Sequence, residues 1–322
     1  MRAIVYDNPG NPEVLYVCER EVPKVHPKEV LIKVKAAGIN RPDIAQRKGN
    51  YPAPSNAVQD ILGLEVSGEV VELGSQVSKL QKGDKVMALV PGGGYAEYVA
   101  ADEGSCLPIP KGVSLEEAAA LPEVLFTVWH NLFRRGGLQT HQRALIYGGS
   151  GGIGSMAIQL AHLSGAKVGT LVSSKEKEEY CRILGADTVL NYKEQDLLEE
   201  WGKHAFNVIL DSVGGEYLDV NLDLLKEGGR LVYINAMEGG KPGLNIFKMM
   251  QKRIAITGST LRPRSLEFKA ELARDILKNA FPLIENSKFS PNVKYRFSPD
   301  EVIEAHQLME SRDFLGKIVI CF

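Results

Sequence analysis

What most constrains the fold of this chain is a glycine-rich segment, Leu145-Ile-Tyr-Gly-Gly-Ser-Gly-Gly-Ile-Gly154. It follows an apolar run of strand length and opens a helical pattern that reaches Ser164. In such a strand-turn-helix unit, small residues allow a tight turn, a close approach of a ligand to the backbone, and close packing of helix on strand. The amides at the helix start bind phosphate. The segment predicts a dinucleotide site formed by Gly149, Gly151, Gly152, Ile153 and Gly154.

The residues after this turn alternate between strand-like and helix-like patterns. The strand-like runs are Lys167–Val172, Thr188–Asn191, Phe206–Asp211, Arg230–Ile234 and Ile254–Gly258. A β-α-β-α order predicts a parallel sheet with helices on both faces, the doubly wound Rossmann arrangement.

The first 122 residues have a different sequence pattern, without the alternation of strands and helices. Short strand-like runs such as Gly68–Leu73, Asp84–Leu89 and Tyr95–Ala100 are bounded by Gly, Pro or Asp, which is typical of a barrel-like β domain. The chain ends with a helical pattern at Leu266–Leu283, a capped helix after Ser298 and an apolar strand. We expect these last elements to join the N-terminal domain. The predicted domains are therefore 1–122 with 267–322, and 123–266.

The end of the second strand of the parallel sheet indicates which nucleotide binds. An NAD site places Asp or Glu about 20 residues beyond the turn, against the ribose 2′-hydroxyl. This chain has Ser173 and Ser174 there, followed by Lys175 and Lys177. Hydroxyl and ammonium groups suit a 2′-phosphate, so we expect NADP, bound by Ser174 and Lys177. The neighbouring glutamates leave open a plain solvated helix start.

Charge and hydropathy exclude some partners. The formal net charge is −2, which argues against recognition of nucleic acid by charge. No uncharged apolar run reaches the ~18 residues that a membrane span needs, and the N-terminus has no signal-peptide pattern. The four cysteines, Cys18, Cys106, Cys181 and Cys321, lie far apart. We expect reduced thiols in a cytoplasmic protein that has neither a nucleic-acid nor a membrane partner.

The same turn also has the form of a hydrolase nucleophile elbow, Gly148-x-Ser150-x-Gly152. Asp211 and His306 follow in the order of such a triad. A serine hydrolase leaves the third glycine and the Ser-Ser-Lys strand end unexplained, and it stays a minor alternative.

Several further stretches carry a resemblance to a known family: Gly38-Ile-Asn-Arg-Pro-Asp43, Gly63-Leu-Glu65, Gln46–Pro52, Leu89–Tyr98, Asn191-Tyr192 and Gly316–Val319. They resemble the zinc-independent quinone oxidoreductases of the medium-chain dehydrogenase/reductase superfamily, most closely the tumour-suppressor-inducible type. The resemblance covers essentially the whole chain. It implies a GroES-like catalytic domain built from both chain ends, together with a Rossmann domain.

Zinc members of that superfamily have a metal-binding Cys where this chain has Asn40, and a His where it has Leu64. Neither side chain present here is a zinc ligand, so we expect no metal. Without a Lewis acid, the chemistry suits acceptors that are already electrophilic. The expected activity is NADPH-dependent reduction of quinones or activated enones by hydride transfer.

The resemblance also implies roles for single residues. It places Tyr51 facing the nicotinamide, where the phenol hydrogen-bonds a carbonyl, delivers a proton or only packs. Asn40 fixes the nicotinamide ribose or the substrate, or it serves only a structural turn. Tyr192 is expected near the 2′-phosphate or adenosine. The nicotinamide half is expected near Thr127, Ser259 and Leu261.

Two alternatives remain within the nucleotide-binding interpretation. A 2-enoyl-thioester reductase shares the pattern of Asn40, Asp43, Gly49 and Tyr51, and a low-turnover NADPH-binding protein would keep the cofactor site alone. Family resemblance further implies a homodimer paired through the edge strand near Ile254–Gly258.

Overall fold

The computed structural model describes residues 1–55 and 57–322. These residues form two compact units, Met1–Phe126 with Arg262–Glu285 and Ser290–Phe322, and Thr127–Leu261 with Asn286–Phe289. These bounds differ from the predicted 122/123 and 266/267 by a few residues. Glu123 belongs to the first unit because its backbone N–H donates to the Glu65 carboxylate. Arg262 belongs there because its guanidinium bonds the Pro91 carbonyl.

The second unit contains a six-stranded sheet in the order β10-β9-β8-β11-β12-β13, in which all neighbours are parallel. The strands are β8 (Arg143–Ile146), β9 (Lys167–Val172), β10 (Thr188–Asn191), β11 (Phe206–Asp211), β12 (Leu225–Tyr233) and β13 (Ala255–Gly258). The parallel Rossmann sheet expected from the sequence is confirmed, and its strand order is the usual order of that fold. Strand order reverses between β8 and β11, and ligands of such sheets bind at the carboxyl ends of the strands beside that point.

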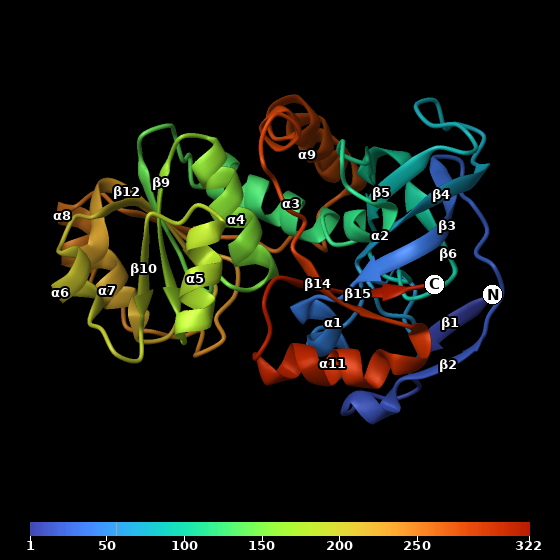
Figure 1. Cartoon of the computed structure of the whole chain (residues 1–322), viewed down its shortest axis with the longest axis horizontal. Helices are drawn as coiled ribbons and strands as arrows, with labels where there is room; N and C mark the ends of the chain where they lie inside the picture. The colour runs from blue at the N-terminus through green and yellow to red at the C-terminus, as the bar shows by residue number, and fades with distance from the viewer. Residues whose placement is uncertain (56) are drawn as a thin grey trace. The chain divides into compact units, whose positions relative to one another are not determined.

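Helices cover both faces of this sheet. Figure 1 shows α4 and α5 on one side and α7 and α8 on the other. Their bounds, with those of α6, are α4 (Gly152–Leu163), α5 (Lys175–Ile183), α6 (Leu197–Trp201), α7 (Tyr217–Leu224) and α8 (Ile246–Gln251). The core is made by strand and helix residues that include Leu145, Phe206, Ile209, Leu222 and Leu231, all fully buried. Apolar side chains on both faces of the strands explain why these runs read as continuous hydrophobic segments.

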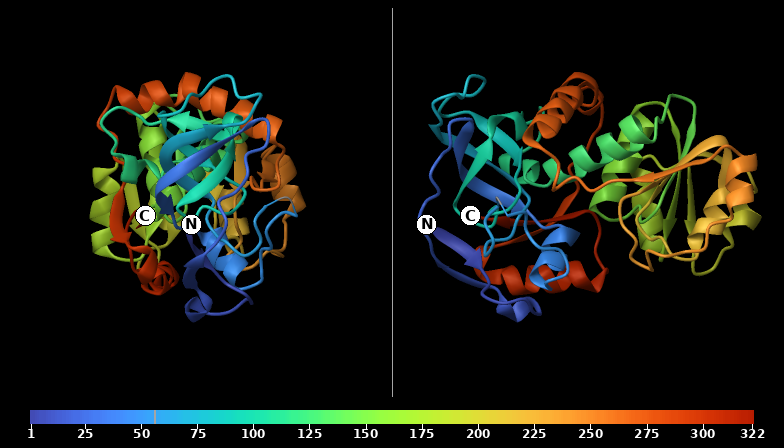
Figure 2. Two further views of the ribbon diagram at one scale, coloured as in Figure 1. Left: turned by 90° about the vertical axis from the view of Figure 1, so that its right-hand side faces the viewer. Right: turned by 180° about the vertical axis from the view of Figure 1, so that it is seen from behind.

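The first unit is built around a seven-stranded sheet in the order β14-β15-β3-β4-β5-β7, with β6 also paired to β3. The strands are β3 (Glu29–Gly38), β4 (Glu65–Leu73), β5 (Lys85–Leu89), β6 (Tyr98–Asp102), β7 (Cys106–Pro108), β14 (Val293–Phe297) and β15 (Lys317–Cys321). A separate hairpin pairs β1 (Arg2–Val5) with β2 (Tyr16–Glu19). Figure 2 shows the red C-terminal strand against the blue N-terminal strands, so both chain ends build this unit.

The helices of the first unit are α1 (Arg41–Arg47), α2 (Leu115–Ala118), α9 (Leu266–Asn279), α10 (Phe281–Glu285) and α11 (Val302–Ser311). The helix expected over Leu266–Leu283 is wrong as one piece. It ends at Asn279 and a second helix begins at Phe281, because Pro282 has no N–H to continue the ladder. Residues 293–297, which lie in the polar stretch between the two expected helices, form β14.

Between the units' main segments the chain runs through α3 (Pro122–Val128) and a π-helical stretch at Trp129–Arg135. No helix within the described residues is both long and apolar enough to cross a membrane.

Candidate active site

The glycine turn of the second unit lies between the end of β8 and the start of α4, with Gly151 as the helix N-cap. A Cβ at Gly149 would lie 2.2 Å from Thr170 Oγ1 on β9, and one at Gly154 would lie 2.2 Å from the Gly148 carbonyl oxygen. Side chains are therefore excluded where helix, turn and strand pack. A Cβ at Gly151 would meet only the Gly148 oxygen, at 3.7 Å. Bare backbone beside the α4 amides fits a diphosphate.

The residues predicted to read the 2′-phosphate meet at the carboxyl end of β9. Ser174 caps α5, its Oγ accepting from the Lys177 N–H at 3.4 Å, and Lys177 Nζ lies 3.5 Å from Ser173 Oγ. The Tyr192 N–H donates to the Val172 carbonyl at 3.1 Å, which puts this half-exposed tyrosine beside the same strand end. Hydroxyl and ammonium groups therefore share the position that a carboxylate occupies in NAD sites.

A hollow of about 560 Å³ opens where β12 and β13 end. Its lining includes Gly214, Ile234, Asn235, Ala236, Gly258, Ser259 and Thr260. Of the residues predicted for the nicotinamide half, Ser259 lines the hollow and donates to Asn131 Oδ1 at 2.7 Å. Asn131 Nδ2 in turn donates to the Thr127 carbonyl at 2.9 Å. Leu261 is 7% exposed and is absent from this lining.

Sequence reasoning missed the other lining residues. Asn235 and Ala236 follow the end of β12, and Gly214 follows the end of β11, so the rule that ligands bind at the carboxyl ends of strands would have found them. Gly214 is held in place by Asp211, whose Oδ1 accepts from the Val213 and Gly214 N–H groups at 2.6 and 3.0 Å.

These bonds also exclude the hydrolase triad. The second oxygen of Asp211 accepts from Asn221 Nδ2 at 2.9 Å, and no histidine among the described residues bonds this carboxylate. His306 is fully buried in the first unit, with Nδ1 3.1 Å from Arg47 Nη1. Burial and the Arg47 charge lower its pKa to about 3. A ring in that setting cannot serve Ser150 as a base.

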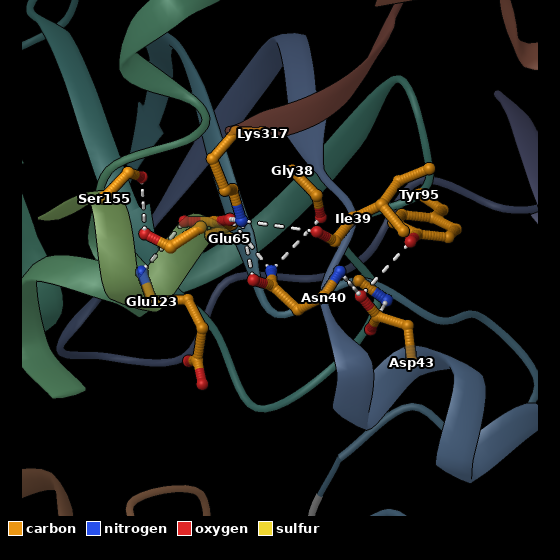
Figure 3. A network of polar contacts seen from close by, with 11 residues as sticks. Gly38, Ile39, Asn40, Asp43, Glu65, Tyr95, Glu123, Ser155 and Lys317 are labelled. Atoms are coloured by element: carbon orange, nitrogen blue, oxygen red, sulfur yellow. Dashed lines mark hydrogen bonds and ion pairs between the residues drawn. The ribbon is translucent and has the colours of Figure 1, made fainter. Parts of the chain in front are cut away.

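In the first unit, Asn40 begins α1 inside a buried polar network (Figure 3). Its backbone N–H donates to Asp43 Oδ2 at 2.8 Å, and the same oxygen accepts from the Tyr95 hydroxyl at 3.2 Å. The other Asp43 oxygen accepts from the Gly63 N–H at 3.2 Å. Burial raises the pKa of Asp43 to about 6 although these three donors oppose the shift. Asp43 therefore ties α1 to the segments that carry Gly63 and Tyr95.

The Asn40 side chain is engaged at both ends (Figure 3). Lys317 Nζ donates to Asn40 Oδ1 and to Glu65 Oε1, each at 2.6 Å. Asn40 Nδ2 donates to the same Glu65 oxygen at 2.8 Å, and the Glu123 N–H donates to Glu65 Oε2 at 2.9 Å. An ammonium group thus lies against the residue that stands at the metal-binding cysteine position of zinc relatives. Sequence reasoning assigned no role to Glu65 or Lys317.

Leu64, at the other position where those relatives bind metal, is a core residue with 2% exposure. Residues 1–55 and 57–322 contain no group of three or more His, Cys, Asp or Glu side chains that could hold a metal ion.

Tyr51, expected to hydrogen-bond a carbonyl, to deliver a proton or only to pack, is partly buried and lies beside an arginine. The Arg262 Cζ is 5.6 Å from the centre of the Tyr51 ring. Burial raises the pKa of the Tyr51 phenol, which keeps it protonated as a hydrogen-bond donor. Glu123 is close enough to influence this phenol, and burial together with Glu65 raises the pKa of Glu123 to about 7.

Comparison with known proteins fits both units. The family description "Zinc-binding dehydrogenase" matches residues 152–277, and "Alcohol dehydrogenase GroES-like domain" matches residues 26–111. A 2-methylene-furan-3-one reductase of Solanum lycopersicum is 32% identical over 99% of this chain and 79% of its own length. A chloroplastic NADPH-dependent alkenal/one oxidoreductase of Arabidopsis thaliana has the same identity and coverage.

Among solved structures, the Escherichia coli quinone oxidoreductase complexed with NADPH has a TM-score of 0.86 and 28% identity, with 100% of each chain covered. Its likeness spans the GroES-like first unit and the Rossmann second unit. The chain described here is therefore a member of the medium-chain dehydrogenase/reductase superfamily, with quinone oxidoreductases among its relatives.

Proposed function

We propose that this protein is an NADPH-dependent reductase of quinones or activated enones. The observation that carries the proposal is the strand end of β9, where Ser173, Ser174 and Lys177 replace the carboxylate of an NAD site. The open backbone at Gly151 supports it. The names of the relatives, an alkenal/one oxidoreductase and a quinone oxidoreductase bound to NADPH, agree with this chemistry.

The second unit supplies the groups that bind the nucleotide. The amides of Gly152, Ile153 and Gly154 at the start of α4 hold the diphosphate, against the bare backbone of Gly149 and Gly151. Ser174, Lys177 and Tyr192 bind the 2′-phosphate. Ser259, linked to Thr127 through Asn131, positions the nicotinamide half, and the buried Leu261 follows the lining residues Ser259 and Thr260 in the chain. When bound, NADPH supplies the hydride.

The first unit supplies hydrogen bonds to the acceptor. The phenol of Tyr51 donates to the carbonyl oxygen and so polarises the carbon skeleton toward hydride addition. In an enone, hydride forms a C–H bond at the β-carbon and a proton then adds to the α-carbon. A quinone gains one hydride and one proton and becomes a hydroquinone. Asn40 keeps the backbone ahead of α1 in place through its bonds to Glu65 and Lys317.

Steady-state consumption of NADPH tests this assignment. We expect turnover with a naphthoquinone and with an alkenone, weak turnover with NADH in place of NADPH, and full activity after treatment with a chelator. Faster turnover of an enoyl-CoA than of either acceptor would favour a 2-enoyl-thioester reductase. Tight NADPH binding without turnover on any of the three would leave only a nucleotide-binding protein.

We further propose that the protein works in the cytoplasm as a homodimer paired through β13. This strand ends the sheet order and bonds only to β12 among the described strands. An unpaired sheet edge is a ready template for a second copy. Ala255→Lys places a charge on an exposed residue of this edge. Light scattering should then show monomers, whereas an unchanged dimer would place the interface elsewhere.

A further inference from the structure

A buried arginine of the first unit, Arg262, has its guanidinium group held in place by hydrogen bonds from two of its three nitrogens. Arg262 is 8% exposed. Its Nε donates to the Pro91 carbonyl at 2.8 Å and its Nη2 donates to Gln46 Oε1 at 2.7 Å. Its own carbonyl accepts from Lys269 Nζ at 2.9 Å. Because two of its nitrogens are anchored, the direction of the whole planar guanidinium group is set.

The third nitrogen of this guanidinium has no partner. Arg262 Nη1 is buried and makes no hydrogen bond to any described residue. No ion pair joins Arg262 to a carboxylate within residues 1–55 and 57–322, and Asp43 and Glu123 affect its charge only at longer range. A buried donor left unsatisfied is rare in folded proteins because it loses its bonds to water. A donor held in this state is suited to a ligand that completes it.

The neighbouring aromatic side chain is Tyr51, whose ring centre lies 5.6 Å from the Arg262 Cζ and which carries a second donor, its hydroxyl. We infer that Arg262 Nη1 and the Tyr51 hydroxyl together bind the acceptor oxygen that becomes negatively charged during reduction. This inference rests on the proposed reductase function and names its ligand class, which is aryl and vinyl oxyanions and the carbonyls that form them. A guanidinium is well suited to this role because it stays charged and donates in a fixed plane.

The step balances with one hydride from NADPH and one proton from water. Hydride addition forms a C–H bond at the β-carbon, and the π electrons of the double bond move to the carbonyl oxygen. The resulting enolate oxygen accepts hydrogen bonds from Arg262 and Tyr51, and Arg262 keeps its proton throughout. A proton from water then adds to the α-carbon and restores the carbonyl, so the acceptor is reduced by two electrons and the nucleotide is oxidised by two.

The inference can be tested with 4-nitrophenol, a coloured phenol that ionises near neutrality. The wild-type protein should bind it as the phenolate, and the pKa of the bound phenol should fall. Arg262→Gln should weaken phenolate binding about 10–100-fold, the range for loss of a hydrogen bond to a charged group. It should also lower kcat/KM for a naphthoquinone, while the NADPH dissociation constant stays unchanged.

Arg264→Gln is the matched control, because this arginine is exposed and only covers the Phe268 ring at 4.1 Å. It should bind phenolate like the wild type. If Arg262→Gln does not fold, as judged by thermal melting, Arg262→Lys is the variant to test. It keeps the positive charge but loses the forked N–H donors of the guanidinium, so phenolate binding should still weaken. Wild-type protein without affinity for phenolate, or equal affinity in wild type and the Arg262 variants, overturns the inference. Arg262-dependent phenolate binding without reduction of any acceptor would refute the reductase function and leave this anion site standing.

Discussion

Replacing Lys317 by Met would leave a buried carboxylate without its cation. The Lys317 and Glu65 side chains are 3% and 0% exposed, and their charged atoms are 2.6 Å apart. Removing one partner of a buried ion pair costs about 3–5 kcal/mol, because the other charge remains in a poorly solvated place. At roughly 2–4 °C per kcal/mol for a unit of this size, the melting temperature of the first unit should fall by about 6–20 °C.

Differential scanning calorimetry is the suitable assay, since two units can melt in separate transitions. Lys33→Met, at an exposed position of β3, controls for the loss of a lysine from the same sheet. The double variant Lys317→Met with Glu65→Gln should recover much of the loss, because no unpaired charge is left. A Lys317→Met transition within about 2 °C of the control, a shift worth roughly 1 kcal/mol or less, would refute this reasoning. So would a double variant no more stable than the single one.

Three other predictions follow from the site. Lys177→Ala should weaken NADPH binding by about 1.5–3 kcal/mol, roughly 10–150-fold, and leave NADH binding almost unchanged by calorimetry; equal losses would remove Lys177 from the phosphate site. Gly151→Ala should reduce NADPH affinity without changing the melting temperature. Gly154→Ala should lower the melting temperature, because its Cβ would overlap the Gly148 backbone. The reverse pattern would contradict the roles assigned to the two glycines. Burial raises the pKa of Glu123 from 4.5 to about 7, so the folded protein holds a proton that the unfolded chain releases, and stability should fall as pH rises across that window. Glu123→Gln should make this fall shallower. The slope that remains is the sum of a fall from Asp43, whose pKa is raised to about 6, and an opposing rise from His306, whose pKa is lowered to about 3. An unchanged slope would show that Glu123 does not titrate there.

The parts of the fold that sequence predicts well are those whose cause is local. The bounds of β9, β10 and β11 agree with the expected runs, because each is a short apolar segment closed by turn residues. The glycine turn is equally local, since the positions that exclude a Cβ lie within six residues of one another. The division of the helix before Pro282 also has a local cause, since a proline disfavours helical backbone at the residue before it and lacks the N–H that would continue the helix.

The first unit's polar network could not be found in this way. Lys317 meets Glu65 across 252 positions of the chain, and Arg262 meets Gln46 across 216. Pairs this distant are set by the sheet order and not by neighbouring residues. The available hint was a lone lysine that opens the apolar strand Lys317–Cys321, since a charge at the start of a buried strand needs a partner. Tyr51 was found only through family resemblance, and its arginine neighbour was not found at all.

The placement of β15 has a consequence for biosynthesis. This strand lies between β14 and β3, so the first unit's sheet stays divided until residues 317–321 have left the ribosome. The second unit is nearly continuous, from Thr127 to Leu261, so its strands and helices are synthesised well before the first unit is complete. During translation the Ala36–Gly38 end of β3 must therefore wait for partners that are made more than 280 residues later, whereas the Glu29–Lys33 part of the strand pairs with the much earlier β6. We therefore expect chaperones to bind this end of β3 during synthesis, and we expect truncation of β15 to destabilise the first unit.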